Sequence, residues 1–190
     1  FCCAVLAGAV TPCVFAVGTF ESENVTLHSW LALADFGNPS NGSDCWGYTS
    51  PSGREYALMG LYDKMSVVEI TNPNNPTIVG SISHSGSLWA DIKVYQDVAY
   101  VSNENGGGID VVDLANVDNG VVTLVQRMTL GGVSDSHNVV VDEESGFLYL
   151  AGGNNSGRLV AYGLTNPRYL TFAGRTLSFI HIRTLRRSTP

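Results

Sequence analysis

The chain has little charge and no recognisable catalytic motif. Aspartate, glutamate, lysine and arginine make up only 14% of its 190 residues. The net charge of −7 disfavours nucleic acid as a partner, because phosphate binding requires a basic surface. The sequence lacks HExxH, CxxC, EF-hand and GxSxG motifs, so it offers no standard metal site or nucleophile elbow. It also lacks alternating helical segments, which disfavours a parallel βαβ sheet.

Cysteine is scarce outside the first segment of the chain. Residues 1–17 are apolar and end on small residues near Ala16, as in the h-region of a secretory signal peptide. We therefore interpret 1–17 as a signal-peptide remnant; a buried strand is the alternative. Because the chain begins at Phe1, we expect an N-terminal fragment of a secreted or cell-surface protein, attached to membranes only through a leader or an anchor not seen here. Cleavage would leave Cys45 as the remaining cysteine, and the sequence does not show whether it is paired.

Three Asn-x-Ser/Thr triplets occur, beginning at Asn24, Asn41 and Asn154. In a eukaryotic secretory pathway they would be acceptors for N-linked glycans.

What the chain does contain is a repeat of short strands. Val67–Ile70 and Val111–Leu114 are β-rich runs, and Ile70 and Leu114 stand 44 residues apart. Tyr100 and Tyr149, which begin two other such runs, stand 49 apart. A period of 40–50 residues with four short strands per unit is typical of β-propeller blades.

We predict an all-β chain with three four-stranded blades, at about 44–83, 90–130 and 137–176. Residues Val25–Leu33 repeat the pattern of Val122–Leu130 and are expected to form the outer strand of a further blade. The propeller domain would then span 24–176 as an incomplete ring. Residues 177–190 would be aberrant sequence, expected to be disordered, or the start of another blade.

Several of these runs resemble one family of exported proteins. The run DCWGYTSPSGREYALMG at 44–60 is similar to the opening of the choice-of-anchor B family, as are Ser87–Tyr95 and Ser136–Asn138. The resemblance covers about residues 24–175. It implies LVIVD-type propeller repeats, export and a C-terminal surface anchor, and it implies no particular reaction. It also predicts a His-Asp pair opening the next blade.

The C-terminal end departs from that pattern. His181 is followed by Ile182 and Arg183, and from Ser145 onward the chain has six arginines and no acidic residue. We interpret this as a reading frame that fails after about Asn166, and assign no function to the arginines.

Polar residues recur where each first strand would begin. These are Asp44, Asp91, His137 and Asn138. In a propeller such positions crowd around the central channel, so they could bind a divalent metal such as Ca²⁺ or Zn²⁺, or orient a small polar ligand. Alternatively, each side chain hydrogen-bonds neighbouring backbone at a blade junction.

Trp46 and Trp89 occupy near-equivalent positions in this reading. They would pack between blades or form an aromatic platform for a sugar or peptide. The leading hypothesis is a non-catalytic exported propeller that binds an unknown protein, peptide or glycan. The alternative is a metal-dependent hydrolase or lactonase-like propeller that uses the Asp and His residues, because the fold alone does not decide between them.

Overall fold

The computed structural model describes residues 23–155 and 158–176, and nearly all of their regular structure is antiparallel sheet. The predicted signal-peptide remnant at 1–17 and the predicted aberrant end at 177–190 lie outside the described residues. No helix in the described part of the chain is long and apolar enough to cross a membrane.

Three antiparallel sheets of four strands follow one another along the chain. Sheet A consists of β1 (Gly42–Thr49), β2 (Glu55–Leu61), β3 (Lys64–Glu69) and β4 (Thr77–Ser83). Sheet B consists of β5 (Ile92–Tyr95), β6 (Val98–Val101), β7 (Ile109–Asp113) and β8 (Thr123–Met128). Sheet C consists of β9 (Asn138–Asp142), β10 (Phe147–Ala151), β11 (Val160–Gly163) and β12 (Thr171–Arg175). The described residues also contain four short 3₁₀ helices: η1 (Leu33–Phe36), η2 (Val117–Asn119), η3 (Leu130–Gly132) and η4 (Gly153–Asn155).

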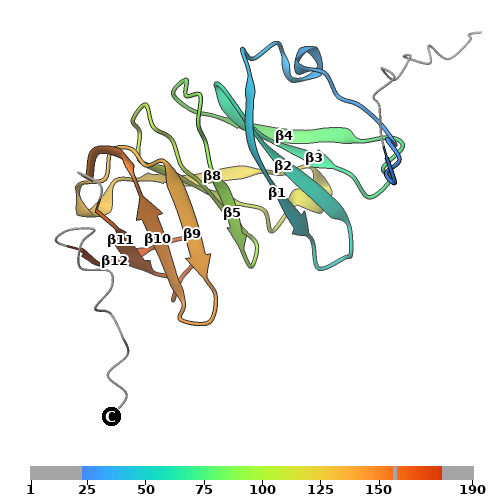
Figure 1. Ribbon diagram of the computed structural model, residues 1–190. Helices are drawn as coiled ribbons and strands as arrows, with labels where there is room; N and C mark the ends of the chain where they lie inside the picture. Colours follow the sequence, from blue (N-terminus) through green and yellow to red (C-terminus); the bar gives the residue numbers. More distant parts are fainter. Residues whose placement is uncertain (1–22, 156–157, 177–190) are drawn as a thin grey trace, which may run out of the picture.

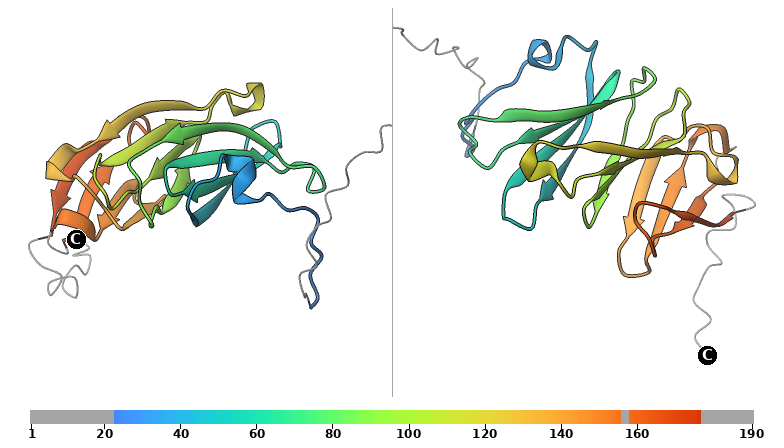
Figure 2. Two further views of the ribbon diagram at one scale, coloured as in Figure 1. Left: turned by 90° about the horizontal axis from the view of Figure 1, so that it is seen from above. Right: turned by 180° about the vertical axis from the view of Figure 1, so that it is seen from behind.

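These sheets confirm the prediction of an all-β chain with three units of four strands. Within each sheet the strands pair in sequence order, so every connection joins neighbours. The sheets lie side by side in chain order, and neighbouring sheets contact each other through their first strands, β1 with β5 and β5 with β9 (Figure 1). The same order is seen from above and from behind (Figure 2).

Two apolar layers hold the sheets face to face. The layer between sheets A and B contains Leu58, Val67 and Ile92, and the layer between sheets B and C contains Tyr100, Leu148 and Tyr162. All six side chains are fully buried. Each sheet therefore contributes alternate residues of its strands to a neighbour, as the period-2 pattern requires.

Side-chain hydrogen bonds join neighbouring sheets at the end that carries the β1–β2 turn. The hydroxyl of Tyr56 in β2 donates to Oδ1 of Asp118 in η2, between β7 and β8, at 2.7 Å, and Arg54 donates to the Asp118 carbonyl at 2.6 Å. Between sheets B and C, Arg168 donates to Asp97 at 2.7 Å and to Asp113 at 2.8 Å. The Arg168 guanidinium holds the pKa of Asp113 below its usual value.

The predicted outer strand at Val25–Leu33 is wrong. Residues 25–32 form no strand, and η1 begins at Leu33. The described residues provide no partner strand for this segment. Instead it lies along the outer face of sheet A, where Ser29 donates to the carbonyl of Pro73 at 2.7 Å. Trp30, Leu33 and Phe36 line an apolar groove together with side chains of β2.

Candidate functional site

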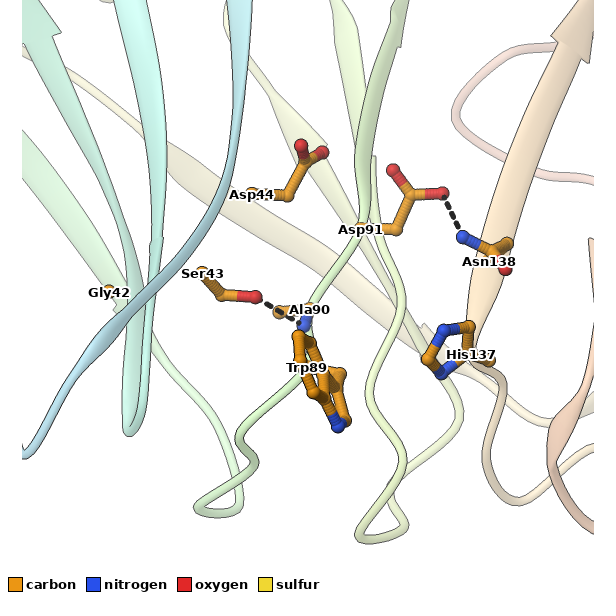
Figure 3. Close-up of a pocket in the computed structure, with 8 residues that line it drawn as sticks. All are labelled: Gly42, Ser43, Asp44, Trp89, Ala90, Asp91, His137 and Asn138. Atoms are coloured by element: carbon orange, nitrogen blue, oxygen red, sulfur yellow. Dashed lines mark hydrogen bonds between the residues drawn. The ribbon is translucent and has the colours of Figure 1, made fainter.

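A pocket lies where the first strands of the three sheets begin. Its volume is about 390 Å³. All four residues predicted to bind a ligand or a metal line it, with one of the two predicted platform tryptophans (Figure 3). We call it the first-strand pocket; its lining residues are Gly42, Ser43, Asp44, Trp89, Ala90, Asp91, His137 and Asn138.

The carboxylates of Asp44 and Asp91 each accept a hydrogen bond from the first strand of the following sheet. Oδ2 of Asp44 accepts a hydrogen bond from the N–H of Ile92 at 3.0 Å, and Oδ2 of Asp91 accepts one from Val139 at 2.9 Å. Both bonds span 48 residues of sequence. Asn138 extends the row by donating from Nδ2 to Asp91 at 3.3 Å, so one polar line crosses all three sheets (Figure 3).

A lysine ammonium lies among these carboxylates. Nζ of Lys93 donates to Oδ1 of Asp91 and to the Ile92 carbonyl, and it lies 3.7 Å from Oδ2 of Asp44. It also lies over the ring of Trp46, 4.3 Å from the centroid. Burial disfavours the charge on Asp91, but Lys93 and the Val139 N–H together hold the pKa of Asp91 below its usual value.

The arrangement does not favour a divalent metal. In residues 23–155 and 158–176, no group of three or more His, Cys, Asp or Glu side chains is placed to hold a metal ion. The Lys93 ammonium already occupies the position between Asp44 and Asp91 that a cation would take. The metal site at Asp44, Asp91, His137 and Asn138 therefore stays a prediction, with local electrostatics against it.

Trp89 and His137 form the rim of the pocket. The Trp89 side chain is exposed, and its ring centroid lies 6.1 Å from that of His137. Nδ1 of His137 is paired with the carboxylate of Glu104 from the β6–β7 loop. In Figure 3 both rings lie on the same side of the row formed by Asp44, Asp91 and Asn138.

The two tryptophans are not equivalent, contrary to the sequence prediction. Trp46 lies within β1, two residues after Asp44, and covers Lys93. Trp89 precedes β5 and stands two residues before Asp91. The sequence prediction matched them because both are tryptophans, but Trp46 follows Asp44 whereas Trp89 precedes Asp91. Only Trp89 lines the first-strand pocket.

The sequence did not predict a second polar cavity. It has a volume of about 440 Å³ and lies between the end of β4 and the glycine-rich loop before β7. His84, Asp110 and Arg127 line it. Burial raises the pKa of Asp110, against the opposing effect of Arg127. Nε2 of His84 is buried and has no hydrogen-bond partner among the described residues. Nothing in the sequence distinguished His84 from an ordinary edge residue.

The three glycosylation triplets differ in their surroundings. Asn24 is exposed, with φ of 58°. Asn41 is half-buried and donates from Nδ2 to the Gly42 carbonyl at 3.2 Å. The Asn154 amide bridges the β8–β9 connection, donating to Gly132 and accepting from Ser134 at 3.3 Å.

Comparison with known proteins gives a fold likeness and no family. No family model matches the chain, and no curated protein matches it. A crystal structure of a protein from Lactobacillus plantarum matches with a TM-score of 0.50 and 15% sequence identity. The match covers 68% of this chain and 40% of that protein, so this chain spans less than half of its length. At this identity the likeness concerns the fold alone.

Proposed function

We propose that the chain is a run of blades from an exported β-propeller of the choice-of-anchor B type, with LVIVD repeats, and that it binds a ligand in the first-strand pocket. Three consecutive four-stranded sheets that contact through their first strands support the propeller arrangement. The structural neighbour is of β-propeller-like type, which agrees with this proposal.

The outer face of sheet C supports the presence of a further blade. Cross-strand pairing places Tyr149 opposite Val140 in sheet C, as Tyr100 stands opposite Lys93 in sheet B. Tyr100 is fully buried against sheet C and donates its hydroxyl to the carbonyl of Pro167 at 2.8 Å. Val140, in contrast, is 50% exposed. The outer face of sheet C therefore has the same residue pattern as the face of sheet B that packs against sheet C. We propose that another sheet packs against this outer face.

Ligand binding rests on one observation: the first-strand pocket joins an exposed indole to polar groups from three sheets. Polar groups that converge next to an aromatic surface are typical of small-molecule sites. The polar row also fixes the relative positions of the pocket walls, because Asp44 and Asp91 tie each first strand to the next. A pocket held in this way is organised before a ligand arrives.

A non-catalytic role fits this geometry better than the metal-dependent alternative. A hydrolase of that kind needs a metal-activated water, and the ammonium of Lys93 competes for the same carboxylates. We accordingly propose a binding protein whose partner is a protein, a peptide or a glycan, located outside the cell. N-terminal sequencing of the protein isolated from its source tests the location: a mature end near Val17 supports export, and retention of residues 1–17 contradicts it.

The binding proposal is tested by NMR of the three tryptophan indoles. The chain has only Trp30, Trp46 and Trp89, so three indole N–H signals are expected, assigned by single Trp→Phe substitutions. We expect members of a library of small polar compounds to shift the Trp89 signal and leave Trp30 unchanged, because Trp30 lies on the outer face of sheet A. A library in which no compound shifts Trp89 contradicts the proposed function.

A further inference from the structure

We infer that the first-strand pocket takes a saccharide, with a sugar ring against Trp89 and its hydroxyl groups on the carboxylate of Asp44. This inference rests on the proposed binding function and adds the class of ligand. Three features of the pocket support it: an exposed indole on a hydrogen-bonded backbone, a wall rich in hydrogen-bond acceptors, and an ammonium group in contact with its carboxylates.

The indole of Trp89 is exposed although its backbone is fixed. Ser87, which is buried, donates its hydroxyl to the Trp89 carbonyl at 2.7 Å and accepts the Trp89 N–H at 3.3 Å. The next N–H, that of Ala90, donates to Ser43 in sheet A at 3.1 Å. Trp89 as a whole is nevertheless 54% exposed. A rigid backbone that presents an open aromatic face loses little entropy when a ligand stacks on it.

The wall beside this indole consists mainly of acceptors. The Asp44 side chain is 38% exposed, whereas Asp91 next to it in the row is 14% exposed and already bonded to Lys93 and Val139. Nδ1 of His137 is paired with the Glu104 carboxylate, and whenever the imidazole carries a single proton on Nδ1, its Nε2 is a further acceptor. A sugar ring offers several hydroxyl donors along one edge and an apolar C–H face, and these match the acceptor wall and the indole respectively.

The charges of the pocket argue against three other ligand classes. Two carboxylates repel an anion. The Lys93 ammonium opposes a metal ion, since it lies in contact with Asp91 and 3.7 Å from Asp44. The same ammonium reduces the attraction for an organic cation, and it favours ionised Asp91 without any ligand. A neutral ligand that donates hydrogen bonds is the class that remains.

Isothermal titration calorimetry of the full chain tests this inference. The probes are methyl β-D-glucopyranoside, methyl α-D-mannopyranoside, N-acetylglucosamine and cellotriose, with tetramethylammonium chloride as the cationic probe. We expect at least one saccharide to bind and to shift the Trp89 indole signal. Trp89→Ala is expected to weaken binding by at least about tenfold, and Asp44→Asn by about fivefold. Trp30→Ala is the matched control: Trp30 is 57% exposed but distant from the pocket, and its loss should leave affinity unchanged.

The other outcomes separate this inference from the proposed function. If tetramethylammonium binds in a Trp89-dependent way and no saccharide does, the saccharide inference is overturned and the binding function stands. If no probe shifts Trp89, the saccharide inference is again overturned, and the compound library decides the binding function independently. Equal loss of saccharide binding in Trp30→Ala and Trp89→Ala would also overturn it. Thermal melts of each variant confirm that the compared proteins are folded.

Discussion

Removing the Asp91 carboxylate is predicted to destabilise the junction between sheets B and C. Oδ2 of Asp91 accepts the Val139 N–H at 2.9 Å, and Oδ1 is paired with Lys93. The side chain is only 14% exposed, so water replaces these contacts poorly in the Asp91→Ala variant. Hydrogen bonds to a charged group contribute about 1.5–3 kcal/mol each, and breaking a buried pair costs about 3–5 kcal/mol. Because this pair retains some exposure, we expect a loss of about 2–4 kcal/mol in the free energy of unfolding.

Urea denaturation at pH 7 measures this loss, and a chain of this size should also melt about 5–15 °C lower. Asp91→Asn keeps an acceptor for Val139 and loses the charge, so about 1 kcal/mol is expected. Asp63→Ala is the matched control: Asp63 is 50% exposed and lies 3.7 Å from Lys64, and its removal should change stability by less than about 0.5 kcal/mol. An Asp91→Ala variant as stable as Asp63→Ala would refute the reasoning.

Acid provides a second check on Asp91. Its pKa is lower in the folded chain than the unfolded value of about 3.9. The folded state therefore gains stability from the ionised group above that unfolded pKa and loses it as the pH falls through the lower folded pKa. The stability difference between the wild type and Asp91→Asn should be complete at pH 7 and shrink below about pH 4. A difference that grows on acidification would contradict the ion pair with Lys93.

Three further predictions concern other contacts. A lysine at position 168 cannot bond to both Asp97 and Asp113, so Arg168→Lys should lower the free energy of unfolding in urea by about 1–2 kcal/mol. Wild-type stability of this variant would contradict the role of these two bonds. Tyr100→Phe should lower the free energy of unfolding by about 1 kcal/mol because the Pro167 carbonyl loses its donor. Tyr149→Phe, on the outer face of sheet C, should lower it by less than about 0.5 kcal/mol. Equal losses would contradict that difference in environment. In a mammalian secretory host, mass spectrometry should find Asn24 glycosylated and Asn154 largely free, since the Asn154 amide is bonded to the β8–β9 connection; higher occupancy at Asn154 would contradict this.

The strands could be predicted because their signals are local. Val111 and Val112 stand between two aspartates and after a glycine-rich loop, and β7 forms there. The convergence of Asp44, Asp91 and Asn138 followed from their recurrence at the start of each first strand. Pattern and position were sufficient for these features because neighbouring strands pair in sequence order.

What the sequence could not supply was the identity of distant partners. The aspartates bond to backbone N–H groups 48 residues away, and Lys93 reaches back to Asp44; neither contact has a sequence signal. Residues 25–33 repeat a strand pattern but form no strand, because pairing requires a neighbour. The burial of Nε2 in His84 likewise depends on how sheets A and B meet.

The most direct test of the binding site is a crystal structure of the chain grown with the saccharide that binds best. We predict the sugar ring stacked on Trp89, its hydroxyls on Asp44, and the Lys93 ammonium still between the carboxylates of Asp44 and Asp91. A sugar bound elsewhere, or a metal ion between Asp44 and Asp91 with Lys93 displaced, would contradict this account.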